Sequence, residues 1–331
     1  MGAECSKGLL ESLMNGVLVP IVERVKDDLT LDIELRDNGI ELYYRGAQLM
    51  RVKEKEITKS NNELVKGISF PSAEVTEENV TKWIEVIPKI KDCLDRGAKN
   101  GYTTGPKGAE LETEQIIVRE NNLLMGKSFN TDYYITDIER DVGNARFDLV
   151  AVKSVKGNGK GPKDRRTPPK KFAVIELKYD VDALLESTNP QAGKEKRASL
   201  RDHFRSMKQF LEDNKNLVNL GEITKAQYNF KYDLDLIDNS GGSLKRIEED
   251  HKWEKPEYII ILANFDQHYI DKNTKTKRSL KQELLFIKDN YSEVFKAFDV
   301  KFATSCGMGY ALFNRCMKSF DEFMVYLSSL E

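Results

Sequence analysis

The clearest pattern of hydrophobic and polar positions lies between residues 29 and 52. Hydrophobic residues alternate there with polar ones on both sides of a turn: Leu29, Leu31, Ile33 and Leu35, then Ile40, Leu42 and Tyr44. A period of two is typical of strands with one buried face. The intervening Asp37-Asn38-Gly39 favours the positive φ angles of a tight hairpin turn. Residues 49–52, after Gly46, predict a third strand, so the whole segment predicts a β-meander.

Two helical patterns flank this meander, at residues 8–26, with an interruption near Pro20, and at residues 76–96. The glycine-rich segment 97–108 is typical of a linker. We therefore divide the chain near residue 105. The prediction is a smaller α+β N-terminal domain at 1–105, of unknown role, and a larger domain at 106–331.

Strands and helices alternate in the second part of the chain. The predicted strands are 131–139, 145–153, 171–179, 257–264 and 298–305. The predicted helices are 109–121, 198–213, 279–290 and one that begins at Phe320. Such alternation predicts a mixed α/β sheet with helices on both faces. Residues 214–256 are polar and lack a clear period, which predicts an irregular insertion on the rim.

Composition adds the class of protein to this picture. The 331 residues carry 52 Lys+Arg against 54 Asp+Glu, and 40% of them are hydrophobic, which is typical of a charged globular chain. Apolar runs such as 258–263 are too short to span a bilayer. The cysteines and histidines are scattered without a CxxC pair, which argues against a zinc site and favours a reducing compartment. We expect a cytoplasmic protein without a membrane partner.

Candidate chemistry lies on two of the predicted strands. Asp148 interrupts the apolar run 145–153, where a carboxylate without a partner would be costly to bury. Glu176 and Lys178 are two residues apart on the next strand, so both project from one face of the sheet. If the strands are neighbours, Asp148 can meet this pair. Two carboxylates then form an oxygen-rich site suited to Mg²⁺, and the lysine could hold and help to deprotonate a water molecule.

The predicted helix 109–121 supplies a third carboxylate. Glu114 has apolar neighbours at helical spacing: Leu111, Ile117 and Val118. It therefore lies within the stripe that faces the core. Glu112 and Glu120 fall on the other side of the helix, and Glu110 is marginal. We expect Glu114 to be the carboxylate that the helix packs inward.

A helix Glu, then a strand Asp, then Glu-x-Lys on the next strand resembles the PD-(D/E)XK nuclease superfamily. The resemblance covers residues 109–305 and implies a restriction-endonuclease-like mixed sheet flanked by helices. It also implies an Mg²⁺-dependent phosphodiesterase, with Mn²⁺ as a possible substitute, in which Asp148, Glu176 and Glu114 bind the metal. Lys178 would position the attacking water. Phe147 stands where the motif has proline, a departure that is frequent in this family.

A nuclease also needs a basic surface to hold a polyanion. The segment 153–171, which joins the Asp148 and Glu176 strands, carries eight basic residues against one acidic residue, and Lys163, Arg165 and Arg166 lie at its centre. We expect this loop to grip the phosphate backbone. A second group of nucleic-acid-binding candidates lies on the predicted helix 198–213: Arg201, His203 and Arg205. The alternative for each basic group is a solvated surface, and for His203 a half-buried structural role.

These features together predict a metal-dependent nuclease that hydrolyses phosphodiester bonds, with DNA favoured over RNA and a homodimer as a possible assembly. The alternative is an inactive nuclease-like module that binds nucleic acid or a protein partner without cutting. A third interpretation makes the N-terminal hairpin domain a protein-recognition unit and the rest its scaffold. The intact set Asp148, Glu176 and Lys178 favours the enzyme, because drift in a decayed site usually removes one member.

Overall fold

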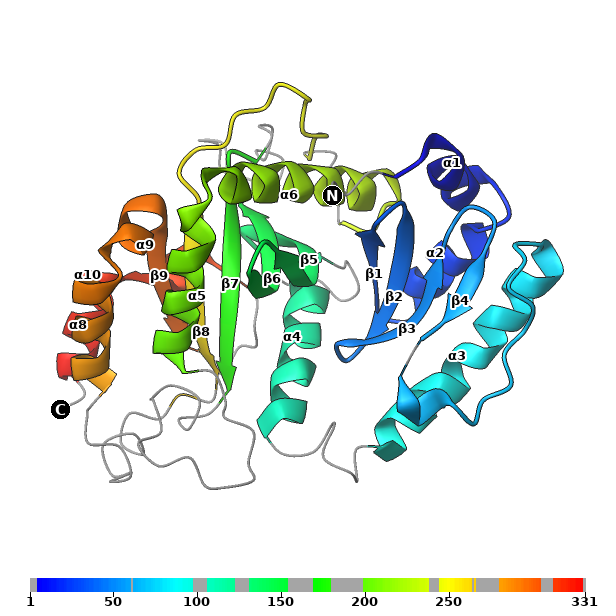
Figure 1. Cartoon of the computed structure of the whole chain (residues 1–331), viewed down its shortest axis with the longest axis horizontal. Helices are drawn as coiled ribbons and strands as arrows, with labels where there is room; N and C mark the ends of the chain where they lie inside the picture. The colour runs from blue at the N-terminus through cyan, green and yellow to red at the C-terminus, as the bar shows by residue number, and fades with distance from the viewer. Residues whose placement is uncertain are drawn as a thin grey trace.

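Two β-sheets lie side by side in the structure, with helices packed around them (Figure 1). This computed structural model describes residues 5–60, 62–97, 106–122, 131–153, 169–179, 199–237, 244–263, 265, 280–304 and 312–329. One sheet has four strands in the order β1-β2-β3-β4, and the other has six in the order β10-β9-β8-β7-β6-β5. Within these ranges no helix combines the length and the apolar character needed to cross a bilayer.

The N-terminal part contains the smaller, antiparallel sheet. Its elements are α1 (Lys7–Asn15), α2 (Val19–Asp27), β1 (Leu31–Arg36), β2 (Gly39–Tyr44), β3 (Ala47–Val52), β4 (Ile57–Lys59), the 3₁₀ turn η1 (Glu63–Val65) and α3 (Glu77–Gly97). Asp37 and Asn38 have φ angles of 39° and 60°, which confirms the predicted hairpin turn. The helical break near Pro20 is also confirmed, since this proline lies in the first turn of α2.

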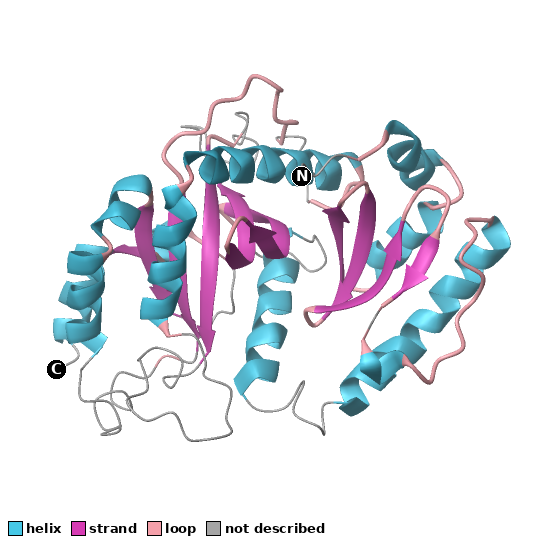
Figure 2. Cartoon of the chain, viewed as in Figure 1, coloured by secondary structure: helices cyan, strands magenta, loops and turns pink. Residues whose placement is uncertain are grey.

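The larger sheet is mixed, as predicted (Figure 2). Its strands are β5 (Tyr133–Val142), β6 (Ala145–Lys153), β7 (Lys171–Tyr179), β8 (Glu257–Ala263), β9 (Asp299–Thr304) and β10 (Lys318–Ser319). The pairs β7–β8 and β8–β9 are parallel, and the other pairs are antiparallel. The helices around it are α4 (Pro106–Asn122), α5 (Leu200–Glu212), α6 (Asn214–Asp233), α8 (Leu280–Asn290), α9 (Ser292–Ala297) and α10 (Phe320–Ser329), with a 3₁₀ turn η5 (Asn314–Cys316).

Helices cover both faces of this sheet, which confirms the predicted layering. Ile117 and Val118 of α4 belong to a buried cluster with Leu149 and Ile175 of the central strands. Helix α5 packs on the opposite face, where Phe204 lies 5.2 Å from Tyr258 between ring centroids. The residues that carry the candidate chemistry are therefore held between two helical layers.

The prediction of an irregular insertion at 214–256 was wrong for its first half. Helix α6 occupies residues 214–233 and runs across the ends of both sheets (Figure 1). Its buried side includes Gln227 and Lys231, whose partners lie on β1. The buried face is thus partly polar, and a polar face hides the apolar period by which an amphipathic helix is identified.

The two sheets meet where the edges of β1 and β5 face each other. Arg36 donates to the carbonyl of Ile138 at 2.7 Å, and Arg140 donates to the carbonyl of Leu35 at 3.0 Å. The buried Asp137 lies between them, 2.7 Å from the Arg36 guanidinium. Side chains rather than a backbone ladder therefore satisfy these strand edges. One hydrophobic cluster also includes residues of both sheets, so the N-terminal sheet is packed as part of a common core.

Candidate active site

The structure makes β6 and β7 direct neighbours, which is the condition that the sequence left open. Their antiparallel pairing includes Leu149 opposite Ile175, immediately beside the candidate positions. Asp148 lies at the end of this ladder, where its Oδ2 accepts the backbone N–H of Leu177 at 2.7 Å. The Asp148 carboxylate is thus fixed against the backbone of the strand that carries Glu176 and Lys178.

Glu176 and Lys178 form a buried ion pair. Their exposed fractions are 2% and 4%, and Nζ of Lys178 lies 2.6 Å from Oε1 of Glu176. Burial alone would raise the pKa of Glu176, but Lys178 and His203 outweigh burial and hold it at about 2. Burial disfavours the Lys178 ammonium, yet Glu176 and Asp148 raise the pKa of Lys178 above its ordinary value. Both groups are therefore charged at neutral pH.

Helix α4 brings Glu114 to the Asp148 carboxylate. Glu114 is buried, as predicted, and it makes no hydrogen bond or ion pair with any residue in the described ranges. Carboxylate oxygens of Glu110, Glu114 and Asp148 all lie within 4.8 Å of one another. Glu112 faces outward and pairs with Arg45 at 3.3 Å. The predicted helix phase is correct for Glu114 and Glu112.

Glu110 is the acidic residue that sequence reasoning undervalued. It is half-buried, and its Oε1 lies 3.9 Å from Nζ of Lys178. The available signal was its position four residues before Glu114, since residues so spaced are neighbours on a helix surface. The site therefore contains two carboxylates from α4 instead of one.

The acidic residues destabilise one another in this small volume. Burial raises the pKa of Glu114 well above its usual range, and the Asp148 carboxylate raises it further. Burial likewise raises the pKa of Asp148, with Glu176 adding to the effect. Among the described residues, Glu176, Asp148 and Glu110 share the charge of Lys178, so this group would be stabilised by additional positive charge.

His203 lies in contact with the same cluster. Its Nδ1 is 2.8 Å from Oε1 of Glu176, the oxygen that also accepts from Lys178. The sequence placed His203 only among the nucleic-acid-binding candidates. No pattern within α5 signals this contact, because it depends on how the helix packs against β7.

The two arginines of α5 have different environments. Arg201 is held by Glu283 of α8 through two hydrogen bonds of 2.9 and 2.6 Å, and its guanidinium lies 3.9 Å from the ring centroid of Phe286. Arg205 is more exposed and pairs with Asp202 of the first helical turn at 2.8 Å. Arg201 thus connects α5 to α8, while Arg205 lies at the surface.

The predicted basic loop falls largely outside the described residues, including Lys163, Arg165 and Arg166. Its two ends are described. Lys153 pairs with Glu257 at 2.7 Å, and Lys171 pairs with Asp299 at 2.8 Å. Each end is five residues from the acidic site along its strand, a distance of about 17 Å at the rise of a β-strand. The role of the loop in phosphate binding stays a prediction.

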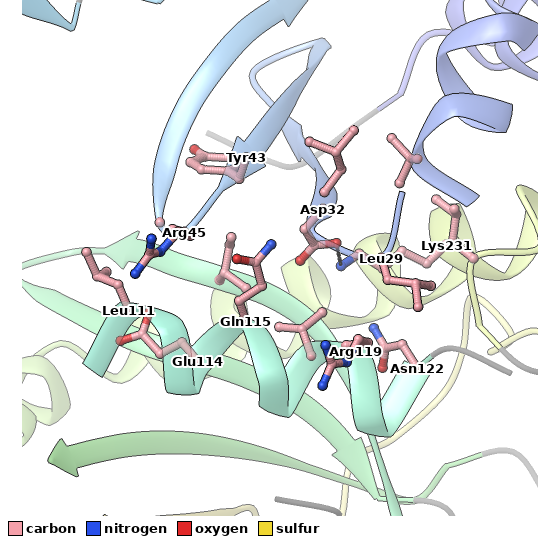
Figure 3. A pocket seen from close by; sticks show the side chains of 16 residues that line it. Leu29, Asp32, Tyr43, Arg45, Leu111, Glu114, Gln115, Arg119, Asn122 and Lys231 are labelled. Atoms are coloured by element: carbon pink, nitrogen blue, oxygen red, sulfur yellow. Dashed lines mark hydrogen bonds and ion pairs between the residues drawn. The ribbon is translucent and has the colours of Figure 1, made fainter. Parts of the chain in front are cut away.

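A cavity adjoins the acidic cluster on the side that faces the N-terminal sheet (Figure 3). It has about 580 Å³ including its open mouth and lies between one face of α4 and the smaller sheet. Glu114 lines it together with Tyr43 and Arg45, while Lys231 lies at the opposite end in Figure 3, with Asp32 between. Glu114 is therefore shared between the cavity and the acidic cluster.

The geometry of this chain is thus the evidence that Asp148, Glu176, Lys178 and Glu114 belong to one site. Comparison of the sequence with protein-family models and with curated proteins, and of the structure with solved structures, returned no match.

Proposed function

We propose that the chain is a metal-dependent nuclease of the PD-(D/E)XK type, with DNA favoured as its substrate. The observation that carries the proposal is that a helix Glu lies beside the strand Asp, whose carboxylate is held against the backbone of the strand that bears Glu-x-Lys. Neighbouring strands supply Asp148 and Glu176, and α4 supplies Glu114 from outside the sheet. Carboxylates without a function are usually exposed to solvent, whereas these are grouped together and partly or fully buried.

The donor set suits a hard divalent cation such as Mg²⁺ or Mn²⁺. Glu110, Glu114 and Asp148 offer oxygen atoms, the ligands that such ions prefer. Glu114 is buried without a described partner, so its ionised form lacks compensation within the described protein. These three residues would hold the ion, and Glu176, which is connected to Glu110 through Lys178, would supply a further oxygen ligand. A bound cation would supply charge stabilisation to the phosphoryl group and to the leaving oxygen.

Lys178 serves in this proposal as a positive charge and a hydrogen-bond donor. Its raised pKa keeps it protonated, and an ammonium group cannot ligate a metal or accept a proton. It therefore positions the attacking water and stabilises the charge that develops near the phosphate. This assignment replaces the idea that the lysine helps to deprotonate the water.

The test is incubation of the full chain with labelled DNA and RNA, single- and double-stranded, in Mg²⁺ and in Mn²⁺. We expect cleavage of at least one substrate, dependent on the metal and abolished by Asp148→Asn. The matched control is Asp321→Asn, because Asp321 is exposed and lies on α10. Metal-independent cleavage, or equal activity in Asp148→Asn, would contradict the proposal. Binding of nucleic acid without cleavage would favour the inactive module.

A further inference from the structure

We infer that His203 is a positioning residue that orients Glu176 toward the metal and the substrate, an inference that rests on the proposed function. His203 lies on α5, and its Nδ1 is 2.8 Å from Oε1 of Glu176. Lys178 donates to that same oxygen at 2.6 Å. Two donors from different elements thus converge on one oxygen of the carboxylate.

The other oxygen of Glu176 is left available. Oε2 makes no hydrogen bond or ion pair with the part of the chain that the structure describes. A carboxylate held through one oxygen presents its second oxygen in a fixed direction. Hydrogen bonds to a metal-binding carboxylate act in this way, and their loss typically costs about 10–100-fold in metal affinity.

Lys178 alone would not fix Glu176 in place. Both side chains lie on β7, and the lysine is also within 3.9 Å of Glu110, so its ammonium is shared between carboxylates. His203 adds a contact from the facing helical layer. It thus defines the position of Glu176 relative to the rest of the fold.

The backbone of α5 is well placed to hold the imidazole. Ser199 and Asp202 form a capping box at its first turn, directly before His203. The next residue, Phe204, packs against Tyr258 of β8 and, at 5.7 Å between ring centroids, against Phe295 of α9. Since a carboxylate only accepts hydrogen bonds, the proton of a neutral His203 lies on Nδ1. Its Nε2 is buried and has no hydrogen-bond partner among the described residues.

This geometry makes the identity of the donor atom testable. An asparagine places its amide nitrogen near the Nδ1 position of histidine, whereas the glutamine amide reaches toward the Nε2 position. His203→Asn should therefore keep the hydrogen bond to Glu176. His203→Gln and His203→Leu should lose it.

The experiment is calorimetric titration of the full chain with Mn²⁺ alone, for wild type and the three His203 variants. Thermal denaturation of each variant verifies folding. We expect His203→Leu and His203→Gln to bind Mn²⁺ about 10–100-fold more weakly than wild type, and His203→Asn to stay close to wild type. A role in packing alone would lower the melting temperature of a variant together with its Mn²⁺ affinity, whereas the positioning role lowers the Mn²⁺ affinity of a variant that melts as the wild type does.

The outcomes distinguish this inference from the proposed function. Unchanged Mn²⁺ affinity in His203→Leu, or equal loss in the two amide variants, overturns the positioning role alone. A wild-type chain that binds no Mn²⁺ overturns the proposed metal site and this inference with it. Weak binding confined to His203→Leu and His203→Gln supports both.

Discussion

Among the described residues, the candidate site contains more carboxylates, buried and half-buried, than Lys178 can balance. Glu110, Asp148 and Glu176 lie around Lys178, and Glu114 lies beside Glu110 and Asp148. Two of the four, Glu114 and Asp148, have strongly raised pKa values, mainly because burial disfavours their charged forms. Such a site stores unfavourable energy in the folded protein until a cation binds.

Substitution of Lys178 should separate catalysis from metal binding. Lys178→Met keeps the aliphatic stem and removes the charge, so we expect cleavage to fall by about 10²–10³-fold, as when one electrostatic stabiliser is lost. Mn²⁺ affinity should fall much less than cleavage, because His203 still holds Glu176 and the competing charge of the lysine has gone. Single-turnover cleavage and calorimetry on the same sample measure the two effects. Lys82→Met, at an exposed position on α3, is the control. Near wild-type turnover in Lys178→Met would remove the proposed role.

Glu114→Gln should fold normally and lose activity, because the amide keeps the shape of the side chain without its charge. It should also change how stability depends on pH. The pKa of Glu114 is raised above its ordinary value of 4.5, so the folded state holds this proton more tightly than the unfolded state. Stability of the metal-free wild type therefore falls as pH rises from 4.5 toward the raised pKa. The variant should lack this contribution.

Thermal denaturation between pH 4 and pH 8, without and with Mn²⁺, would measure this difference. Metal-free Glu114→Gln should melt above the wild type at neutral pH and gain less from Mn²⁺. Glu112→Gln, whose side chain faces outward, should match the wild type in stability and cleavage. An inactive Glu112→Gln variant would show that the assignment of the helix face is wrong.

At the scale of elements, the sequence predicted the strands that carry the site better than the helices around them. β6 and β7 begin and end where predicted, because both are continuous hydrophobic runs in the middle of a sheet. Helix α6 could not be found in this way. Its Gln227 hydrogen-bonds the backbone of Leu35, which lies 192 residues earlier in the chain. A polar residue whose partner is so distant looks like a solvent-facing residue in the sequence.

The same reason explains the partial prediction of the site. Glu114 could be assigned because its own helix carries the apolar stripe that surrounds it. Glu110 and His203 belong to the site because they contact β7: Glu110 lies near Lys178, and His203 lies near Glu176. The spacing of residues within one helix or strand contains no information on contacts with another element. It can only reduce the number of candidate site residues.

From the polar, buried face of α6 we predict how two substitutions change the free energy of unfolding. Lys231 is buried and its Nζ lies 2.7 Å from Oε1 of the buried Glu34 on β1. Lys231→Met should destabilise the chain by about 3–5 kcal/mol, because it leaves a buried carboxylate without its partner. The double variant Glu34→Leu/Lys231→Met should recover much of that loss, since both charges are then replaced by apolar groups.

Urea denaturation of the wild type, both single variants and the double variant completes the cycle. Lys215→Met, at an exposed position of the same helix, should be within about 0.5 kcal/mol of the wild type. Additive losses in the double variant would mean that the two charges do not interact as a pair.

At the scale of the whole molecule, the N-terminal sheet is tied to the larger one by charge and by packing. Arg36 and Arg140 connect the facing edges of β1 and β5, and Lys231 connects α6 to β1. A common hydrophobic cluster extends through both sheets. Opening this junction would expose apolar surface and leave buried charges without partners, and both changes are unfavourable. We therefore expect the two parts to unfold together.

The two tryptophans provide a direct test of that expectation, because each lies in a different part. Trp83 is buried on α3, where its indole donates to the carbonyl of Ser72 at 2.8 Å. Trp253 packs against Phe172 of β7, with ring centroids 5.4 Å apart. The variants Trp253→Phe and Trp83→Phe each leave one fluorescent reporter, since the chain has only 2 tryptophans. Within each variant, fluorescence and far-UV circular dichroism should give coincident urea midpoints, as a single cooperative transition requires.

Each variant is compared with itself, so any destabilisation by the substitution shifts both signals together. A Trp83 transition that precedes the loss of total secondary structure would show that the N-terminal sheet opens while the larger sheet persists. The two parts would then be independent domains, and the contacts of Arg36, Arg140 and Lys231 would contribute too little to couple them. Coincident transitions would instead make the N-terminal sheet a fixed wall of the cavity beside Glu114.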